Sequence, residues 1–240
     1  MSLLELERVG KRYRDADLER AVLRDVSLEL ETGELAVVWG LRGSGRSTLL
    51  RVAAGIEAPE TGVVRFEGRD LHGHAEETLG AGIGFCERTL AGNGARPVLE
   101  VLMVVLLARG VPQPQARSRA REALERTGAA GCAQQLVSRL DTAETVRVAI
   151  ARVLALAPRL IVIDEPIAGV DLLQRDGILA LLSSLARDGV AVLASAGEST
   201  ALSGADRAFS LSEGELSGAP ARELAPVLPL RRAQARGAGA

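Results

Sequence analysis

The sequence has few of the residues that mark extracellular, metal-binding or membrane-spanning proteins. Only two cysteines are present, Cys86 and Cys132, and they follow no signal peptide and lack metal-site spacing. We therefore expect free thiols in a reduced, cytosolic compartment. No stretch reaches the ~20 apolar residues of a membrane span, and the longest candidate, Val98 to Ala108, contains Glu100. Any membrane role is predicted to depend on a partner protein.

Aromatic residues and lysine are also scarce. Aromatics make up 2% of the chain, and Tyr13 is the only tyrosine. Lys11 is the only lysine, so arginine supplies nearly all of the 29 basic residues. The formal net charge of -2 argues against a nucleic-acid partner, because such partners select a strongly basic face. With 47% hydrophobic and 25% charged residues, the 240-residue chain has the composition of one globular domain.

Apolar patterns divide the chain into a sheet core and an inserted helical lobe. Two stretches alternate apolar and polar residues, which predicts antiparallel strands: Leu3 to Tyr13 and Ala21 to Leu30. Three short apolar runs predict buried strands of a parallel sheet with helices on both faces: Leu35 to Trp39, Leu160 to Ile163 and Val190 to Ala194. Helical patterns from Val98 to Leu154 predict the lobe. Residues 226–240 are predicted to form a low-complexity tail.

A glycine-rich segment, GLRGSGRST, follows the first of these apolar strands and opens a predicted helix near Ser47. This context predicts a P-loop, in which backbone N–H groups and a helix N-terminus bind phosphate, rather than a turn without chemistry. Ser47 stands where the loop's hydroxyl binds Mg²⁺, and Arg46 stands where the loop normally has lysine. The expected nucleotide-binding residues are Gly40, Gly43, Ser44, Gly45, Arg46, Ser47 and Thr48.

Two adjacent carboxylates end the strand LIVIDE, which runs from Leu160 to Glu165. Successive side chains of a strand point to opposite sides. Asp164 is therefore predicted to bind Mg²⁺ together with Ser47, and Glu165 to act as the catalytic residue that polarises water at the γ-phosphate of ATP. A solvated pair at a strand end is the alternative, and the P-loop argues against it.

The stretch RVAIARVLALAPRLIVIDEPIAGVD, Arg147 to Asp171, resembles the run in ATP-binding-cassette (ABC) ATPases that joins the signature helix to the second carboxylate strand. Asp171 then lies in the family's dimer-contact loop. The resemblance extends from Leu3 to Leu216, and its spacing looks closest to subunits of lipoprotein-releasing, macrolide-exporting and cell-division systems. It implies that Tyr13 stacks on adenine, an interaction of about 1 to 3 kcal/mol. A tyrosine at a strand edge is the alternative.

The same resemblance implies a fold, partners and a location. The expected fold is an α/β P-loop NTPase of ABC type, with a RecA-like parallel-sheet core, an antiparallel β subdomain and an inserted α-helical subdomain. The ATP-binding domain would span residues 1–225, with the helical subdomain at about 90–155. Such subunits form homo- or heterodimers and couple ATP to a separate integral membrane subunit. The chain is expected to be cytoplasmic and peripheral, at the inner face of the cell membrane.

Several positions depart from the family's γ-phosphate contacts. Arg46 replaces the lysine, Arg88 takes the place of a glutamine, and Ala196 falls where the family has a histidine. The signature segment becomes LDTAE, with aspartate for serine and alanine for a glycine. Its residues are Leu140, Asp141, Thr142, Ala143 and Glu144.

Each departure has a chemical consequence. Asp141 would bring a carboxylate toward the partner's γ-phosphate unless it turns away or is protonated. Ala196 cannot hydrogen-bond to phosphate. Arg46 is longer and forked, although the chain's arginine bias alone could explain it. Because one lost transition-state contact commonly costs ~2.7 to 4 kcal/mol, we expect Mg-ATP binding with attenuated hydrolysis. The alternative is a non-hydrolysing pseudo-ATPase that acts as a nucleotide-sensing or structural subunit.

Overall fold

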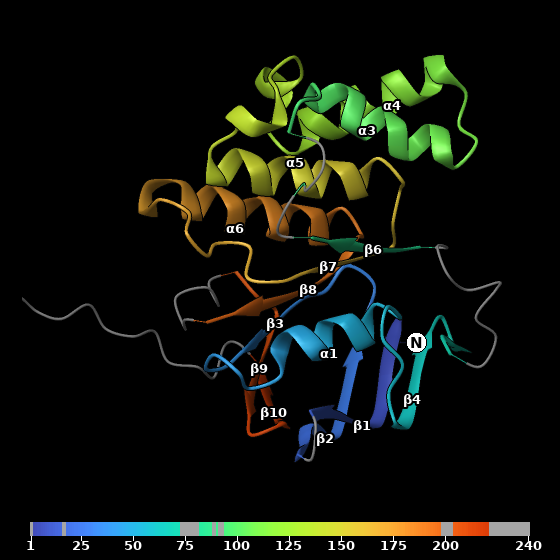
Figure 1. Cartoon of the computed structure of the whole chain (residues 1–240), viewed down its shortest axis with the longest axis vertical. Helices are drawn as coiled ribbons and strands as arrows, with labels where there is room; N and C mark the ends of the chain where they lie inside the picture. The colour runs from blue at the N-terminus through green and yellow to red at the C-terminus, as the bar shows by residue number, and fades with distance from the viewer. Residues whose placement is uncertain are drawn as a thin grey trace, which may run out of the picture.

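The computed structural model describes residues 2–15, 18–72, 82–87, 90, 94–197 and 204–220, which form two sheets with helices packed against them (Figure 1). The first sheet is antiparallel, with strand order β2-β1-β4-β5. Its strands are β1 (Leu4–Asp15), β2 (Leu18–Leu30), β4 (Thr61–Phe66) and β5 (Arg69–Asp70). The two alternating stretches of the sequence are β1 and β2, so that prediction is confirmed.

The second sheet has the order β10-β9-β3-β8-β7-β6, and all its strands except β10 run parallel. The three apolar runs form β3 (Leu35–Trp39), β7 (Leu160–Ile163) and β8 (Ala191–Ala196). The remaining strands are β6 (Ile83–Cys86), β9 (Arg207–Ser212) and β10 (Glu215–Pro220). Because β3, β7 and β8 are parallel neighbours, their carboxyl ends meet at one edge of the sheet, which is where open α/β sheets bind ligands.

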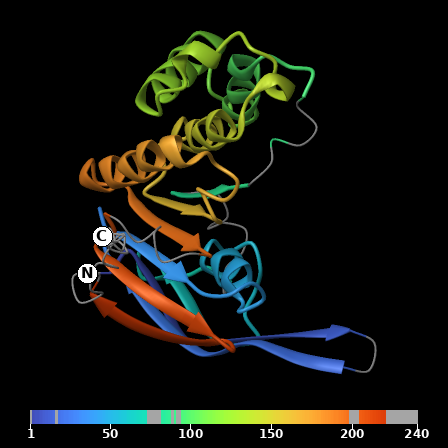
Figure 2. The same cartoon turned by 90° about the vertical axis from the view of Figure 1, so that its left-hand side faces the viewer.

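Side chains of the central strands alternate between two hydrophobic cores. Val37 and Ile161 belong to the core shared with α6 (Leu172–Arg187) and the helical lobe. Val38 and Val162 belong to the core shared with α1 (Arg46–Ala53) and the antiparallel sheet. Figures 1 and 2 show these as layers on either side of the central sheet. The sheet is therefore buried on both faces, as the apolar strands predicted.

The inserted lobe lies between β6 and β7 in the chain, as expected. It contains two 3-10 turns, η1 (Ala130–Cys132) and η2 (Val137–Arg139), and three helices: α3 (Val98–Ala108), α4 (Gln113–Arg126) and α5 (Thr142–Leu154). Gly110 and Gly128 follow the caps of α3 and α4 with φ of 77° and 69°, the left-handed conformation that ends helices. Helix α5 packs on α3 and α4 on one side and on α6 and β6 on the other. It therefore connects the lobe to the sheet.

Candidate functional site

The loop between β3 and α1 has the geometry of a phosphate cradle. Gly43 and Gly45 have φ of 84° and 107°, and a Cβ on Gly45 would lie 2.6 Å from the carbonyl oxygen of Val22. Gly45 is the N-cap of α1, whose first turn contains no acidic residue. The free N–H groups and the positive end of the helix are thus open to an anion.

Two buried polar groups of the cradle fit a bound phosphate. Within the described chain, Ser44 Oγ and Arg46 Nη1 are buried and have no hydrogen-bond partner. Buried polar atoms are normally satisfied, so each is an unused donor at the place where the loop would hold an anion. Both residues belong to the predicted nucleotide-binding set, and their role there stays a prediction.

The cradle opens on a cavity of about 740 Å³, a size typical of small-molecule sites. Its lining includes Tyr13 of β1 and Arg20 of β2, together with Glu165 and Gly197. Arg20 Nη2 also donates to the Gly43 carbonyl oxygen at 3.2 Å. Arg42 and Arg46 also line the cavity, so its lining holds three arginines and one glutamate and suits a polyphosphate.

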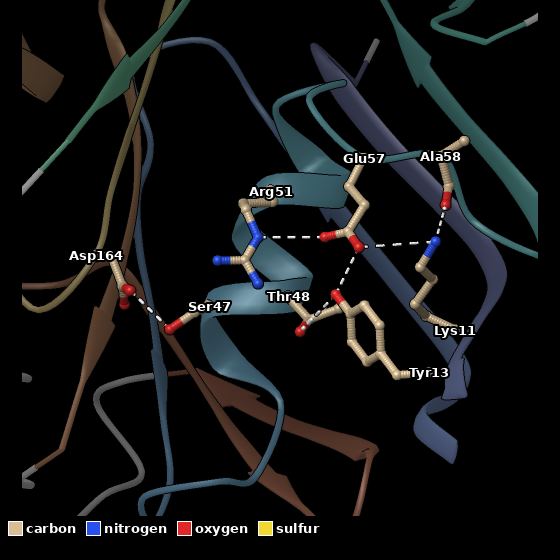
Figure 3. Close-up of polar contacts among 8 residues, drawn as sticks. All are labelled: Lys11, Tyr13, Ser47, Thr48, Arg51, Glu57, Ala58 and Asp164. Atoms are coloured by element: carbon tan, nitrogen blue, oxygen red, sulfur yellow. Dashed lines mark hydrogen bonds and ion pairs between the residues drawn. The ribbon is translucent and has the colours of Figure 1, made fainter. Parts of the chain in front are cut away.

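The predicted metal ligands lie next to each other at the end of the cradle. Ser47 Oγ donates to Asp164 Oδ2 at 2.7 Å, which joins the start of α1 to the end of β7 (Figure 3). Ser195 Oγ donates to the other carboxylate oxygen, Asp164 Oδ1, at 2.5 Å. A hydroxyl and a carboxylate at this separation are hard oxygen ligands, so the pair fits Mg²⁺.

Glu165 faces the cradle from a strained backbone position. Its φ of 47° is left-handed, which is uncommon for a non-glycine residue and frequent at functional sites. Its backbone N–H donates to Ser195 Oγ at 2.9 Å. Its side chain lines the cavity on which the cradle opens.

Arg46 does not extend along the loop but pairs with Glu165. Arg46 Nη2 donates to Glu165 Oε1 at 2.7 Å, and the arginine side chain is only 7% exposed. The residue that replaces the expected lysine therefore contacts the predicted catalytic carboxylate directly. A partly buried charge-assisted hydrogen bond of this length is among the stronger polar contacts in proteins.

Tyr13 is held by its hydroxyl group, which leaves its ring at the cavity wall (Figure 3). The hydroxyl donates to Glu57 Oε1 at 2.6 Å and lies 3.3 Å from Thr48 Oγ1, which therefore acts as a donor to it. Lys11 Nζ lies 3.7 Å from the same Glu57 oxygen, and Arg51 Nε donates to the other at 3.2 Å. Burial raises the pKa of Glu57, but these partners outweigh burial and hold that pKa below its usual value. The hydrogen bonds of the hydroxyl thus fix the orientation of the Tyr13 ring.

Ala196 ends β8 beside this site and contributes only a methyl group. It is 2% exposed, and its carbonyl oxygen accepts from the N–H of Gly40 at 3.2 Å. Glu165, Arg175 and Ala196 line a second cavity of about 200 Å³. At this position the chain thus supplies no side-chain donor for a phosphate.

Residues 23–168, more than half of the chain, match the family model described as ABC transporter. The chain belongs to the ABC transporter family. The chain is therefore a nucleotide-binding subunit of this type, and the fold expected from the sequence is confirmed.

Curated ABC subunits resemble this chain over most of its length. It is 32% identical over 220 residues to the lipoprotein-releasing system ATP-binding protein LolD of Chromohalobacter salexigens, covering 90% of this chain and 93% of that protein. It is 36% identical over 188 residues to the taurine import ATP-binding protein TauB of Pseudomonas aeruginosa, covering 77% of this chain and 68% of that protein. The resemblance to lipoprotein-releasing subunits is thus supported.

Solved ABC cassettes share the fold. The ATP-binding cassette MJ0796, solved as a dimer in a post-hydrolysis state bound to ADP and Pi, superposes with a TM-score of 0.83 at 25% identity. The match covers 91% of this chain and 99% of that one. Over the residues described here, no helix combines the length and apolar character that crossing a membrane requires.

The ABC signature segment shows how the chain accommodates its aspartate. Asp141 is the N-cap of α5: its Oδ1 accepts from the N–H of Glu144 at 2.8 Å, and Glu144 Oε2 accepts from the N–H of Asp141 at 2.9 Å. This is a complete capping box. The sequence predicts that Asp141 either turns away from the partner's γ-phosphate or is protonated. In the structure its carboxylate turns onto its own helix, α5. Leu140 is the C-cap of η2, Thr142 begins α5, and Ala143 is buried.

The other predicted positions fall around the same edge. Asp171 caps α6 by accepting from the N–H of Leu173 at 2.9 Å. The two leucines that follow it, Leu172 and Leu173, are 74% and 93% exposed. Arg88 lies outside the described residues, as does the tail at 226–240. The roles of these positions in an ABC dimer remain predictions.

Both thiols are free and buried. Burial raises the pKa of Cys86 to about 12 and that of Cys132 to about 11, and the hydrogen bond of Cys132 with Glu144 adds to the second shift. A protonated thiol is a poor nucleophile and a poor metal ligand.

Two residues of the site escaped prediction from sequence. Ser195 lies at the end of an apolar run, where a serine indicates only the end of a strand. Glu57 follows α1 among other polar residues, and its partner Tyr13 is 44 positions away. The weak signal for Ser195 was its position directly before Ala196. Glu57 had none.

Proposed function

We propose that this ABC subunit binds Mg-ATP between the glycine cradle and Tyr13 and hydrolyses it slowly. The unused donors of the cradle, Ser44 Oγ and Arg46 Nη1, support triphosphate binding. Ser47 and Asp164 would hold Mg²⁺, which when bound neutralises phosphate charge. The exposed part of the Tyr13 ring offers a stacking surface for the base.

The observation that carries the proposal of slow hydrolysis is the Arg46–Glu165 ion pair. The Glu165 oxygen that accepts from Arg46 Nη2 is already engaged, so it is less free to accept a hydrogen bond from the attacking water. Glu165 must give up or share this contact before it can accept a proton. Ala196 adds no donor that could orient the water in its place. Nucleotide binding therefore needs only the cradle. Fast hydrolysis also needs a free Glu165, which is paired with Arg46, and a side-chain donor at position 196, which alanine lacks.

We further propose that the chain pairs with a second ATP-binding subunit, identical or different, and acts on a separate membrane protein at the inner face of the cell membrane. The dimeric state of MJ0796 and the lipoprotein-releasing and import systems named for its relatives support this assignment. Co-purification of the chain with a membrane subunit, together with its mass in solution, tests it. A chain that stays monomeric with Mg-ATP and binds no membrane protein would contradict it.

Calorimetric titration with Mg-ATP tests the binding function directly. The purified chain should bind Mg-ATP, and Ser47→Ala and Asp164→Asn should weaken binding only when Mg²⁺ is present. Asp188→Asn, an exposed aspartate paired with Arg126 away from the cradle, is the matched control. Wild-type protein that does not bind Mg-ATP would refute the proposal.

The second candidate is a pseudo-ATPase that binds nucleotide without hydrolysing it, and the same ion pair together with Ala196 favours it. Steady-state phosphate release separates the two functions. Slow release that Glu165→Gln abolishes supports an attenuated ATPase. Release that stays at the background of the Glu165→Gln protein, with Mg-ATP bound throughout, supports the pseudo-ATPase.

A further inference from the structure

One buried hydroxyl, that of Ser195, joins the two carboxylates of the site. Ser195 lies on β8 and is 1% exposed. The last pair of the β7–β8 ladder is Ile163 with Ala194, so Ser195 comes directly after that pair, beside Asp164. We infer that Ser195 is a positioning residue that fixes both Asp164 and Glu165 for Mg-nucleotide binding, an inference that rests on the proposed function.

The directions of its hydrogen bonds are determined. A backbone N–H can only donate, so Ser195 Oγ accepts from the N–H of Glu165 at 2.9 Å. The single hydroxyl proton is then given to Asp164 Oδ1 at 2.5 Å. Asp164 Oδ2 meanwhile accepts from Ser47 Oγ at 2.7 Å. Both carboxylate oxygens of Asp164 are therefore held by hydrogen bonds. The oxygen bonded to Ser47, Oδ2, is the one next to the other predicted Mg²⁺ ligand.

The same hydroxyl stabilises the turn that presents Glu165. Strand β7 ends at Ile163, so the N–H of Glu165 lies beyond the sheet ladder and takes the serine hydroxyl instead. The left-handed φ of 47° at Glu165 is unfavourable for a non-glycine residue and needs local support. Loss of the hydroxyl would remove one hydrogen bond from this turn and one from Asp164 at the same time.

A serine that only satisfies buried polar groups would behave differently. It would contribute to folding stability without changing how strongly Mg²⁺ enhances nucleotide binding. A positioning residue supports a metal ligand from behind, and loss of such support commonly lowers metal affinity by about 10- to 100-fold. The dependence of ATP affinity on Mg²⁺ therefore distinguishes the two roles.

The experiment compares ATP binding in Mg²⁺ with ATP binding in excess EDTA by calorimetry, using the full chain. For Ser195→Ala we expect affinity in EDTA within about twofold of wild type and affinity in Mg²⁺ lower by about tenfold or more. Ser195→Thr keeps the hydroxyl and should recover most of the loss. Ser183→Ala is the matched control, because among the described residues that hydroxyl donates to the carbonyl oxygens of Leu179 on α6 and of Gly204, which precedes β9.

Thermal unfolding without nucleotide shows whether each variant is folded. If Ser195→Ala does not fold, Ser195→Cys fills the site with a slightly larger thiol that is a weaker donor, and it should show the same selective loss. Equal losses in Mg²⁺ and in EDTA, or no loss in either, would overturn the positioning role while leaving the proposed function intact. Wild-type protein whose ATP affinity does not respond to Mg²⁺ would overturn the proposed function, and this inference with it.

Discussion

Arg46 Nη2 donates to Glu165 Oε1 at 2.7 Å, so the cation of the phosphate cradle and the predicted catalytic base form one ion pair. The contact links the first turn of α1 to the turn after β7. It also explains why an arginine at this position is not equivalent to a lysine, since its forked end can reach the carboxylate while Nη1 stays available.

Replacing Arg46 by lysine should not restore fast hydrolysis by itself. The change frees Glu165, but Ala196 still offers no donor, and one missing transition-state contact is worth about 10²- to 10³-fold in rate. We expect the steady-state rate of phosphate release by Arg46→Lys to rise by less than about tenfold. A gain of a hundredfold or more would show that Arg46 alone limits the reaction.

Tyr13 and Glu57 should affect nucleotide binding through the base and not through the phosphates. Removing the ring in Tyr13→Ala should weaken ATP binding by about tenfold, because stacking on one aromatic contributes about 1 to 3 kcal/mol. Glu57→Ala should give part of this loss by releasing the hydroxyl, and Glu57→Gln should recover it.

The affinity for inorganic tripolyphosphate, measured by the same titration, should stay unchanged in all three proteins. Glu7→Ala, which removes a glutamate that pairs with Arg65 on the antiparallel sheet, is the control. Equal losses for ATP and tripolyphosphate would instead indicate general damage to the cradle.

The aspartate of the signature segment should stabilise the fold. Asp141→Ala removes the N-cap of α5 and should lower the free energy of unfolding by about 1 kcal/mol, as measured by urea denaturation. Asp141→Ser should retain most of that stability because serine also caps helices. Asp188→Ala removes only an exposed ion pair with Arg126 and should change stability by less than about 0.5 kcal/mol. An unchanged midpoint for Asp141→Ala would contradict the capping role.

Stability should fall at alkaline pH because of the buried thiols. The pKa of Cys86 is raised from 9.0 to about 12, so the folded state keeps a proton that the unfolded chain loses. The stabilisation is complete below pH 9 and is lost as pH rises toward 12, at about 1.4 kcal/mol per pH unit for one thiol. Urea denaturation between pH 8 and pH 11 measures the slope. Cys86→Ala should flatten it, and an unchanged slope would contradict the assignment.

Patterns of apolar residues in the sequence predicted the strands that consist of one continuous apolar run. The strands Leu35–Trp39 and Leu160–Ile163 match to the residue, because each apolar run is bounded by glycine or by polar residues. The short strands β6, β9 and β10 were not predicted. Each has four to six residues, and β9 belongs to the sheet only because it pairs in parallel with β3, far away in the chain.

The residues of the site could be predicted from sequence motifs, but most contacts between their side chains could not. The P-loop and the Asp164–Glu165 pair follow from motifs with fixed spacing, and the structure brings Ser47 and Asp164 together as expected. The contact between Arg46 and Glu165 spans 119 positions and has no pattern in the sequence. Which way a side chain turns depends on its neighbours in space. For this reason sequence could identify Asp141 as a departure without showing that it caps its own helix.

A single-turnover experiment tests the central claim most directly, namely that binding of Mg-ATP is retained while hydrolysis is slow. The chain, in excess over radiolabelled ATP and Mg²⁺, is quenched at intervals from seconds to an hour. We predict that nearly all nucleotide is bound and that it remains intact ATP beyond the first minute. The corresponding rate of hydrolysis lies well below the turnover of about 1 to 10³ per second that is typical of enzymes. Complete conversion to ADP within a few seconds, abolished by Glu165→Gln, would contradict the account.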